Sequence, residues 1–226
     1  MAEYKQYKYI GLLTALYITF TLVSQITAGK ISQFWIFSFS AAIIFFPMTY
    51  VLADVFTEVY GYSQARNRTW LLLLCSIISA ILYALVSWLP PAIGFDANSA
   101  YVRVFSQIPR IVVASWIAIF LGSISNDYVL AKMKVWTKGK YLWTRTIGST
   151  IIGEGIDSII FFTIAFYGLL PTRLLISTII SGWILKILIE TIMTPLTYYV
   201  VSKIKKLEGE DYYDKNTNFN PLIFKN

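Results

Sequence analysis

Long apolar runs separated by short polar segments dominate this chain and predict helices that cross a membrane. A helix needs roughly 20 predominantly apolar residues to span the hydrocarbon core of a bilayer. Six runs are long enough, and they cover residues 9–27, 34–60, 70–88, 111–130, 146–166 and 177–201. The second run is the longest and contains Pro47. The pattern therefore predicts an all-α integral membrane protein with six transmembrane helices.

Lysine and arginine residues are distributed unevenly between the two sets of connecting segments, and this bias predicts the orientation of the chain. Short cytoplasmic segments of membrane proteins carry an excess of Lys and Arg. With the N-terminus inside, about twelve such residues fall on the cytoplasmic side and about four on the outer side. We therefore expect both termini in the cytoplasm, with a transmembrane domain over residues 1–206 and a polar, loosely ordered cytoplasmic tail over 207–226.

The number of spans raises the question of an internal repeat. Two halves of three spans each would have opposite topologies, an arrangement that many transporters share. The middle helix of each half carries an acidic pair, Asp54 with Glu58 and Glu154 with Asp157. Little else in the two halves is similar, so the pattern suggests a 3+3 inverted repeat without further support from the sequence.

Composition agrees with a membrane protein and excludes several chemistries. Hydrophobic residues make up 57% of the chain and charged residues 14%, against about 25% charged residues in soluble domains. The chain has no histidine and one cysteine, Cys75, which excludes an internal disulfide, a His/Cys zinc site and a histidine-activated nucleophile. The positive residues behind the net charge of +7 lie in loops and the tail, so we expect no nucleic acid as a partner. The missing histidine and the lack of a nucleophile motif lead us to expect no metal, no cofactor and no enzyme activity.

Two carboxylates lie four residues apart in the second predicted span. Asp54 and Glu58 share one helical face, and a carboxylate facing lipid is costly, so both are expected to face the interior of the helix bundle. Asp54 lies deeper in the membrane and has the stronger claim to function. Glu58 lies closer to the cytoplasm, where a gating or helix-end role competes with contact to a substrate.

The fifth predicted span carries a second acidic pair beside two glycines. Glu154 lies about 13 Å along the helix from Arg145 at ~1.5 Å per residue, close to the middle of the membrane, and Asp157 follows one turn later. Gly153 and Gly155 remove side-chain bulk beside Glu154, which permits the close approach of another helix or of a ligand. Tight helix packing with both acids paired to bases is the alternative.

The sixth predicted span carries Lys186 and Glu190, again four residues apart. Either they neutralise each other within the helix, or Lys186, as the only basic residue deep in a predicted span, pairs with a carboxylate on another helix. Acids near or inside the spans outnumber bases. Some carboxyl groups must therefore be protonated, reach water or meet a cationic or hydrogen-donating ligand, and coupling to protons is one use of such groups.

Three blocks of residues form a combined pattern: Phe46-Pro47, Thr49-Tyr50, Asp54, Glu58, Tyr60-Gly61 and Arg66; then Arg145, Ser149-Thr150, Gly153, Asp157 and Phe161; then Lys186, Glu190 and Thr194-Pro195. This pattern resembles the queuosine precursor transporter family, also called the putative vitamin uptake transporter family. Pro109-Arg110 with Ser115 and the length of the chain agree with the family. The resemblance implies a secondary transporter in the cell membrane that imports 7-deazaguanine bases, the precursors of the modified tRNA nucleoside queuosine.

The resemblance also implies a site for the edge of a guanine-like base, whose ring N–H and amino group one carboxylate can accept together. Phe46, Tyr50 and Phe161 offer faces on which a base can stack, although packing is the commoner role of an aromatic residue in so aromatic a chain. Gating or structural roles are expected for Glu58, Arg66, Arg110 and Arg145. Substrate binding is expected from Thr49, Tyr50, Asp54, Ser149, Glu154, Asp157, Lys186 and Glu190.

Other classes of function remain open at this stage, as does assembly into a homo-oligomer. Substrate-binding subunits of energy-coupling-factor vitamin transporters are also six-helix proteins of this size, but the first span lacks a clear Ala-x-x-x-Ala pattern for docking a partner. A membrane enzyme, including a protease built on Asp54 and Asp157, lacks its expected motifs. Uptake coupled to protons and facilitated uptake followed by metabolic trapping are equally compatible with the sequence.

Overall fold

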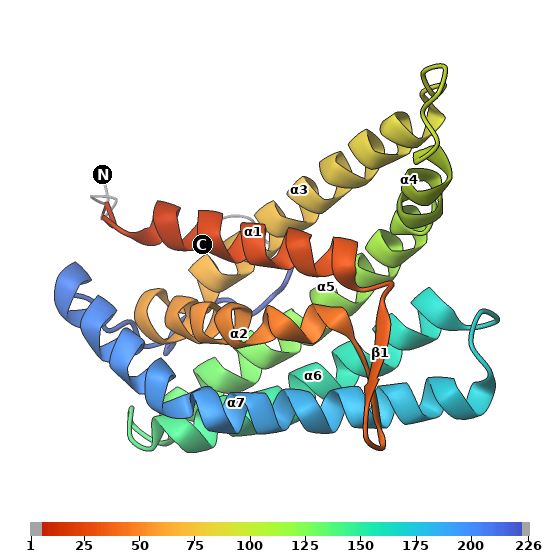
Figure 1. Cartoon of the computed structure of the whole chain (residues 1–226). Helices are drawn as coiled ribbons and strands as arrows, with labels where there is room; N and C mark the ends of the chain where they lie inside the picture. The colour runs from red at the N-terminus through yellow and green to blue at the C-terminus, as the bar shows by residue number, and fades with distance from the viewer. Residues whose placement is uncertain (1–5, 223–226) are drawn as a thin grey trace.

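Five long apolar helices form most of the computed structural model of this chain, which describes residues 6–222 (Figure 1). Each of the five is long and apolar enough to cross a membrane, and the five predicted spans that correspond to them are confirmed as helices. Their outward faces carry exposed leucine and isoleucine side chains, as expected of helices surrounded by lipid. They are α1 (Ile10–Thr27), α3 (Tyr62–Trp88), α5 (Ile108–Trp136) with the short α4 (Asn98–Phe105) before it, α6 (Leu142–Phe166) and α7 (Thr172–Glu208).

The expected helix over residues 34–60 is wrong in its first part, where a β-hairpin takes its place. β1 (Ile31–Phe34) pairs antiparallel with β2 (Phe37–Ser40). Trp35 in the connecting turn has a positive φ of 55°, a conformation that a right-handed helix cannot contain. Pro47 lies in the first turn of the helix that follows, where its missing N–H costs no helical hydrogen bond.

The rest of that predicted span forms a short central helix. The 3₁₀ turn η1 (Ala41–Ile44) precedes α2 (Phe46–Val55), which continues as a π-helical segment, η2 (Phe56–Tyr60). Every residue over 49–60 is buried, because α2 and η2 are surrounded by α1, α3, α5 and α7 (Figure 1). Together α2 and η2 are about 20 Å long at ~1.5 Å per residue, shorter than the helices around them. π-helical segments are rare and often occur at functional sites.

Three helices extend further than the hydropathy pattern predicts. α3 begins before residue 70, α5 continues beyond residue 130, and α7 continues beyond residue 201 with Pro195 in its interior. The added turns contain charged residues that the pattern assigned to loops, among them Arg66, Arg68 and Lys134. These three side chains belong to residues that are at most 2% exposed, because each finds polar partners inside the fold.

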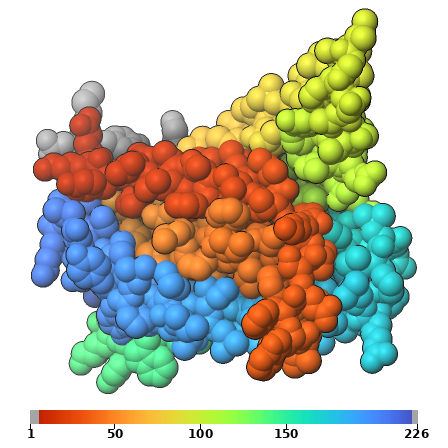
Figure 2. Space-filling view, in the orientation of Figure 1, coloured from red at the N-terminus to blue at the C-terminus, as the bar shows by residue number. Residues whose placement is uncertain are grey.

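The hairpin lies across the face of the molecule that α1, α2 and α7 share (Figure 2). Its second strand packs against α7. Phe34, Trp35 and Ile36 at the tip are each at least 67% exposed. Exposed aromatic residues of this kind are typical of the interface between membrane and water.

Both ends of the described chain meet at one end of the helix bundle, called the terminal end below. Glu208, the last residue of α7, accepts hydrogen bonds from the backbone N–H groups of Lys8 and Tyr9 at 3.0 and 2.8 Å. Residues 209–222 then fold back against α3, and this segment is called the C-terminal strap. The expectation of a loosely ordered tail is wrong for these residues, because side chains and backbone groups of the helices bind them.

Candidate substrate site

Lys186 on α7 lies between two carboxylates of α6, and these three residues are called the Lys186 cluster. The Nζ atom of Lys186 is 2.8 Å from Glu154 Oε2 and 2.6 Å from Asp157 Oδ2. The side chains of Lys186, Glu154 and Asp157 are 5%, 17% and 20% exposed. Of the two alternatives for Lys186, the structure selects pairing with another helix rather than with Glu190 on its own helix.

Two glycines bring α5 and α6 close enough to position this cluster. A Cβ atom on Gly153 would lie 2.6 Å from the Cβ atom of Asn126, and one on Gly122 would lie 2.8 Å from the Cβ atom of Asp157. Both distances are shorter than van der Waals contact, so neither position has room for a side chain. The prediction that Gly153 permits close helix approach is confirmed. Gly122, which faces it from α5, was not recognised in the sequence.

The Lys186 cluster forms part of the wall between two internal cavities. The first has a volume of about 90 Å³ and the second a volume of about 70 Å³. Phe46, Ile119, Asp157 and Lys186 line both of them. Each volume exceeds the roughly 10–15 Å³ that one water molecule requires, so polar ligand atoms can enter. The first cavity, called the polar cavity below, is also lined by Tyr17, Thr21, Thr49, Tyr50, Ala53, Arg68, Ser123, Asn126, Asp127 and Glu154.

The three aromatic residues expected to offer stacking faces all lie beside these cavities. Lys186 Nζ is 4.9 Å from the centroid of the Phe46 ring, within the range of a cation–π contact. The rings of Phe46 and Tyr50 stack with centroids 5.7 Å apart. The buried Tyr50 hydroxyl faces Glu154 but makes no hydrogen bond of good geometry. Phe161 lines the second cavity.

A buried ion pair that the sequence analysis missed lines the polar cavity. Arg68 Nη2 lies 3.1 Å from Asp127 Oδ2, and the Thr57 hydroxyl donates to Asp127 Oδ1 at 2.9 Å. The guanidinium group lies over the Tyr17 ring, 4.3 Å from its centroid. The statement that Lys186 is the only basic residue deep in a span is therefore wrong, because α3 begins earlier than expected. Asp127 could have indicated this ion pair in the sequence, because it is an acid within a predicted span to which no base was assigned.

Three other residues expected to bind substrate do not line either cavity. The Ser149 hydroxyl donates to the Thr146 carbonyl within α6 at 3.0 Å. Asp54 and Glu190 are 2% and 1% exposed, and their carboxyl groups lie within hydrogen-bonding reach of each other. Within residues 6–222, neither Asp54 nor Glu190 forms an ion pair. The acids grouped by the sequence analysis thus separate into the Lys186 cluster and a carboxyl pair behind it.

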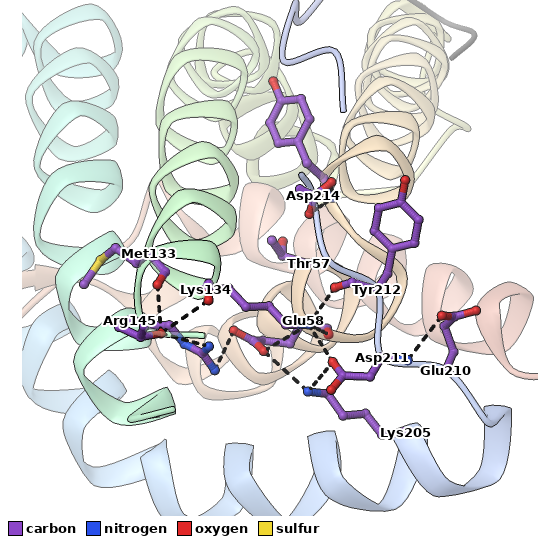
Figure 3. A network of polar contacts seen from close by, with 12 residues as sticks. Thr57, Glu58, Met133, Lys134, Arg145, Lys205, Glu210, Asp211, Tyr212 and Asp214 are labelled. Atoms are coloured by element: carbon purple, nitrogen blue, oxygen red, sulfur yellow. Dashed lines mark hydrogen bonds and ion pairs between the residues drawn. The ribbon is translucent and has the colours of Figure 1, made fainter. Parts of the chain in front are cut away.

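Glu58 is the centre of a polar network at the terminal end (Figure 3). Arg145 Nη2 lies 3.0 Å from Glu58 Oε1, and the Nζ atoms of Lys134 and Lys205 lie 3.6 Å from Glu58 Oε2. The same two Nζ atoms lie 2.7 Å from Asp211 Oδ1 in the C-terminal strap. Glu58 is fully buried, which distinguishes it from an ordinary carboxylate at a helix end. The network joins η2, α5, α6, α7 and the strap.

Arg66 and Arg110, the other two residues expected in gating or structural roles, bind backbone carbonyl groups. Arg66 Nη1 donates to the carbonyl oxygens of Asn218 and Asn220 in the strap, at 3.0 and 2.8 Å. Arg110 donates to two carbonyl oxygens at the end of α6, at 2.9 and 2.6 Å. The last carbonyls of a helix lack partners within it, so Arg110 stabilises this helix end. Within the described residues, no group of three or more acidic or cysteine side chains is arranged to hold a metal ion.

Comparison of the sequence with known families gives one match that covers most of the chain. Residues 40–200 match the family described as "Putative vitamin uptake transporter". This region includes α2, α6 and most of α7, and with them the Lys186 cluster, the carboxyl pair and Glu58. No solved structure matches the chain.

Curated proteins with similar sequences carry related names. A "Probable queuosine precursor transporter" of Bacillus subtilis is 25% identical over 156 residues, which cover 69% of this chain and 68% of that protein. A "Queuosine precursor transporter" of Escherichia coli is 29% identical over 126 residues, which cover 54% of this chain and 52% of that protein. A third, "Probable queuosine precursor transporter" of Haemophilus influenzae, is 23% identical and is matched over 61% of its length.

Proposed function

The chain belongs to the putative vitamin uptake transporter family, and from this premise we propose that it imports queuosine precursors, the 7-deazaguanine bases, into the cell. The family is one of transporters rather than enzymes, and the five long apolar helices agree with a multi-pass protein of the cell membrane. The names of the relatives support the class of substrate. The observation that carries the proposal is the Lys186 cluster, which places two acids and one base at the wall of a buried cavity.

The chemistry of the Lys186 cluster suits the edge of a guanine-like base. Such an edge presents a ring N–H and an amino group as donors next to a carbonyl oxygen as acceptor. A carboxylate, Asp157 or Glu154, accepts the two donors, and the ammonium group of Lys186 donates to the carbonyl. The aminomethyl form of the precursor is also a cation, which two carboxylates facing one ammonium group can accommodate. Phe46 and Tyr50 supply the stacking face above the cluster.

The direction of the helices supports six crossings of the membrane with both termini in the cytoplasm. Successive long elements run in alternating directions, and α2 with η2 supplies one pass between α1 and α3 (Figure 1). The contact between Glu208 and residues 8 and 9 places both ends of the described chain on the same side. The Lys and Arg bias of the sequence makes that side cytoplasmic. The acidic helices α2 and α6 are then the middle passes of two inverted halves.

The arrangement of the cavities and the Glu58 network supports a mechanism of alternating access. The cavities lie between the two ends of the bundle, and the Glu58 network with the C-terminal strap closes the cytoplasmic end beneath them. Opening the cytoplasmic side requires that network to separate, which releases a buried carboxylate and three cations to water. The outward side closes over the substrate site before the cytoplasmic side opens, as in other transporters with a site at mid-membrane. We propose that uptake of the base is coupled to the movement of protons into the cell.

Uptake of labelled 7-deazaguanine bases into cells that cannot synthesise them tests the proposal. Cells that express this chain are expected to accumulate the label, and Asp157→Asn is expected to abolish accumulation and binding, because an amide cannot accept both donors of the base. Asp96→Asn is the matched control, since Asp96 lies exposed in the loop between α3 and α4. Normal binding and uptake by Asp157→Asn would contradict the assigned site.

Reconstitution of the purified chain into liposomes tests whether it transports alone. Accumulation of the labelled base without any other protein is expected. A requirement for partner ATPases would instead assign the chain to the energy-coupling-factor class as a substrate-binding subunit.

A further inference from the structure

Two buried carboxyl groups, one on α2 and one on α7, lie together, and no base among the described residues pairs with them. Asp54 and Glu190 are 2% and 1% exposed, and each lies within hydrogen-bonding reach of the other. Asp54 Oδ2 and Glu190 Oε1 have no other hydrogen-bond partner among the described residues. Two carboxylates contain acceptors only, so a hydrogen bond between them requires a proton on one of the two.

The charged groups around this pair do not supply a counter-ion. Lys186 lies one turn from Glu190 on α7, but its ammonium group is bound by the two carboxylates of α6. Arg68 donates to the Ala53 carbonyl next to Asp54, but its charge is neutralised by Asp127. Ionisable groups from several elements of the bundle surround the pair. They are Tyr50 of α2 and Glu58 of η2, Arg68 of α3, Asp127 of α5, Glu154 of α6 and Lys186 of α7.

Like charges at this distance in a dry interior cannot both persist. Two adjacent carboxylates without a cation repel each other strongly in a low dielectric, and one of them takes up a proton instead. The pair then titrates as a unit that binds one shared proton. The surplus of acids noted in the sequence is therefore located at this pair, because the other acids near the cavity face a lysine or an arginine.

The position of the pair connects the substrate cavity with the cytoplasmic network. Tyr50, which lines the polar cavity, precedes Asp54 by four residues, and Glu58 follows it by four, so each lies about 6 Å along the axis. Both helices that carry the pair are irregular next to it. The π-helical segment begins two residues after Asp54, and Pro195 lies five residues after Glu190. Proline removes a helical hydrogen bond and marks a place where a helix bends.

We propose that Asp54 and Glu190 form the proton-binding site of this transporter, separate from the Lys186 cluster that binds the base. The shared proton enters from the polar cavity while the cytoplasmic network is closed. Movement of α7 relative to α2 separates the two carboxyl groups, and the proton leaves toward the cytoplasm past Glu58. The inference rests on the proposed import of a base. It describes that import as symport, in which the carboxyl pair carries one proton into the cell with each base.

Uptake driven by an imposed pH gradient tests the assignment in liposomes that contain the purified full-length chain. With labelled 7-deazaguanine base outside and an interior about one pH unit more alkaline, the steady-state accumulation of the base by wild-type protein is expected to exceed the accumulation at equal pH about tenfold, because each co-transported proton contributes the tenfold ratio of proton concentrations. In Asp54→Asn with Glu190→Gln, which keeps the shape of both side chains, this ratio is expected to fall to about one. A ratio unchanged from wild type, or stimulation that follows sodium rather than protons, would overturn the proposal.

Infrared absorption of the protein without substrate provides a second test, which does not depend on transport. It applies even if the double variant transports too slowly or if the protein binds a compound other than a deazaguanine. Wild-type protein at neutral pH is expected to show the absorption of a protonated carboxyl group. The absorption should vanish in the double variant and persist in Asp157→Asn and Asp96→Asn. Its persistence in the double variant would overturn the proton site. Its loss there, together with absent binding of deazaguanine by wild-type protein, would leave the proton site standing and refute the proposed substrate.

Discussion

The ammonium group of Lys186 lies 2.6 Å from Asp157 Oδ2, so one buried ion pair joins α7 to α6 at the boundary of two cavities. Glu154 approaches the same ammonium group to 2.8 Å from one turn away. Asp157 and Lys186 line both cavities, so this pair is accessible from either one. The pair therefore links two helices at the boundary of both cavities, which is why the proposed function assigns the base to it.

Replacing Lys186 with methionine is expected to destabilise the protein by about 3–5 kcal/mol, because two largely buried carboxylates would lose the only cation that pairs with them among residues 6–222. Thermal unfolding of the purified protein in detergent measures the effect. Lys206→Met, at an exposed position near the end of α7, is the matched control and should leave the unfolding temperature unchanged. Adding Asp157→Asn to Lys186→Met should restore part of the lost stability. Equal stability of Lys186→Met, Lys206→Met and the double variant would contradict the ion pair.

Arg68 and Asp127 are expected to depend on each other in a double-mutant cycle. Arg68→Gln and Asp127→Asn each leave a buried charge unpaired, whereas the double variant leaves none. The cost of the double variant should therefore be smaller than the sum of the single costs, with a coupling of about 0.5–3 kcal/mol. Unfolding free energies of the four proteins measure the coupling. Additive costs would mean that the two side chains do not interact in the membrane.

Gly153→Ala is expected to destabilise the contact between α5 and α6 by about 1–3 kcal/mol, because the added methyl group has no space beside Asn126. The same change should lower binding of the base, since it displaces the helix that carries Glu154 and Asp157. Gly11→Ala is the control: no atom lies within 4 Å of the added Cβ there, so stability should be unchanged or slightly higher. Equal behaviour of the two variants would refute the close approach of the helices.

Asp211 is expected to hold the C-terminal strap in place. Burial raises the pKa of this carboxyl group, but hydrogen bonds and charges from Lys134 and Lys205 outweigh burial and hold its pKa below the usual value. Because the folded-state pKa is lower than the unfolded value of about 3.9, the stabilisation is present at neutral pH and is lost as the pH falls through the folded-state pKa.

The change that tests this role is Asp211→Asn, which removes the charge at every pH. Faster hydrogen exchange and faster proteolysis over residues 209–222 are expected at neutral pH, together with unchanged exchange in α1. Asp96→Asn, a carboxylate in a distant loop, should leave the strap protected. Protection of the strap in Asp211→Asn equal to that of wild type would show that the two lysines do not hold it.

The hydropathy pattern predicted α1 and α6 closely and located the central parts of α3, α5 and α7, because the part of a helix that lies in lipid must be apolar and this requirement is local. The same reasoning failed at residues 34–40, where apolar and aromatic residues are equally suited to strands. The hydropathy pattern also placed Arg68 and Lys134 in loops. A charged residue ends an apolar run in the sequence even where the folded protein supplies it with a buried polar partner.

The sequence by itself determined a membrane protein with paired acids, a deep lysine and close-packing glycines, because spacing along a helix follows from geometry within that helix. Only the tertiary structure decided which charge meets which. Lys186 is bound by residues 29 and 32 positions away, and not by Glu190 on its own helix. Asp54 meets Glu190 because α2 is enclosed by the other helices and packs against α7. Such partners depend on how helices are rotated and packed, which no local pattern specifies.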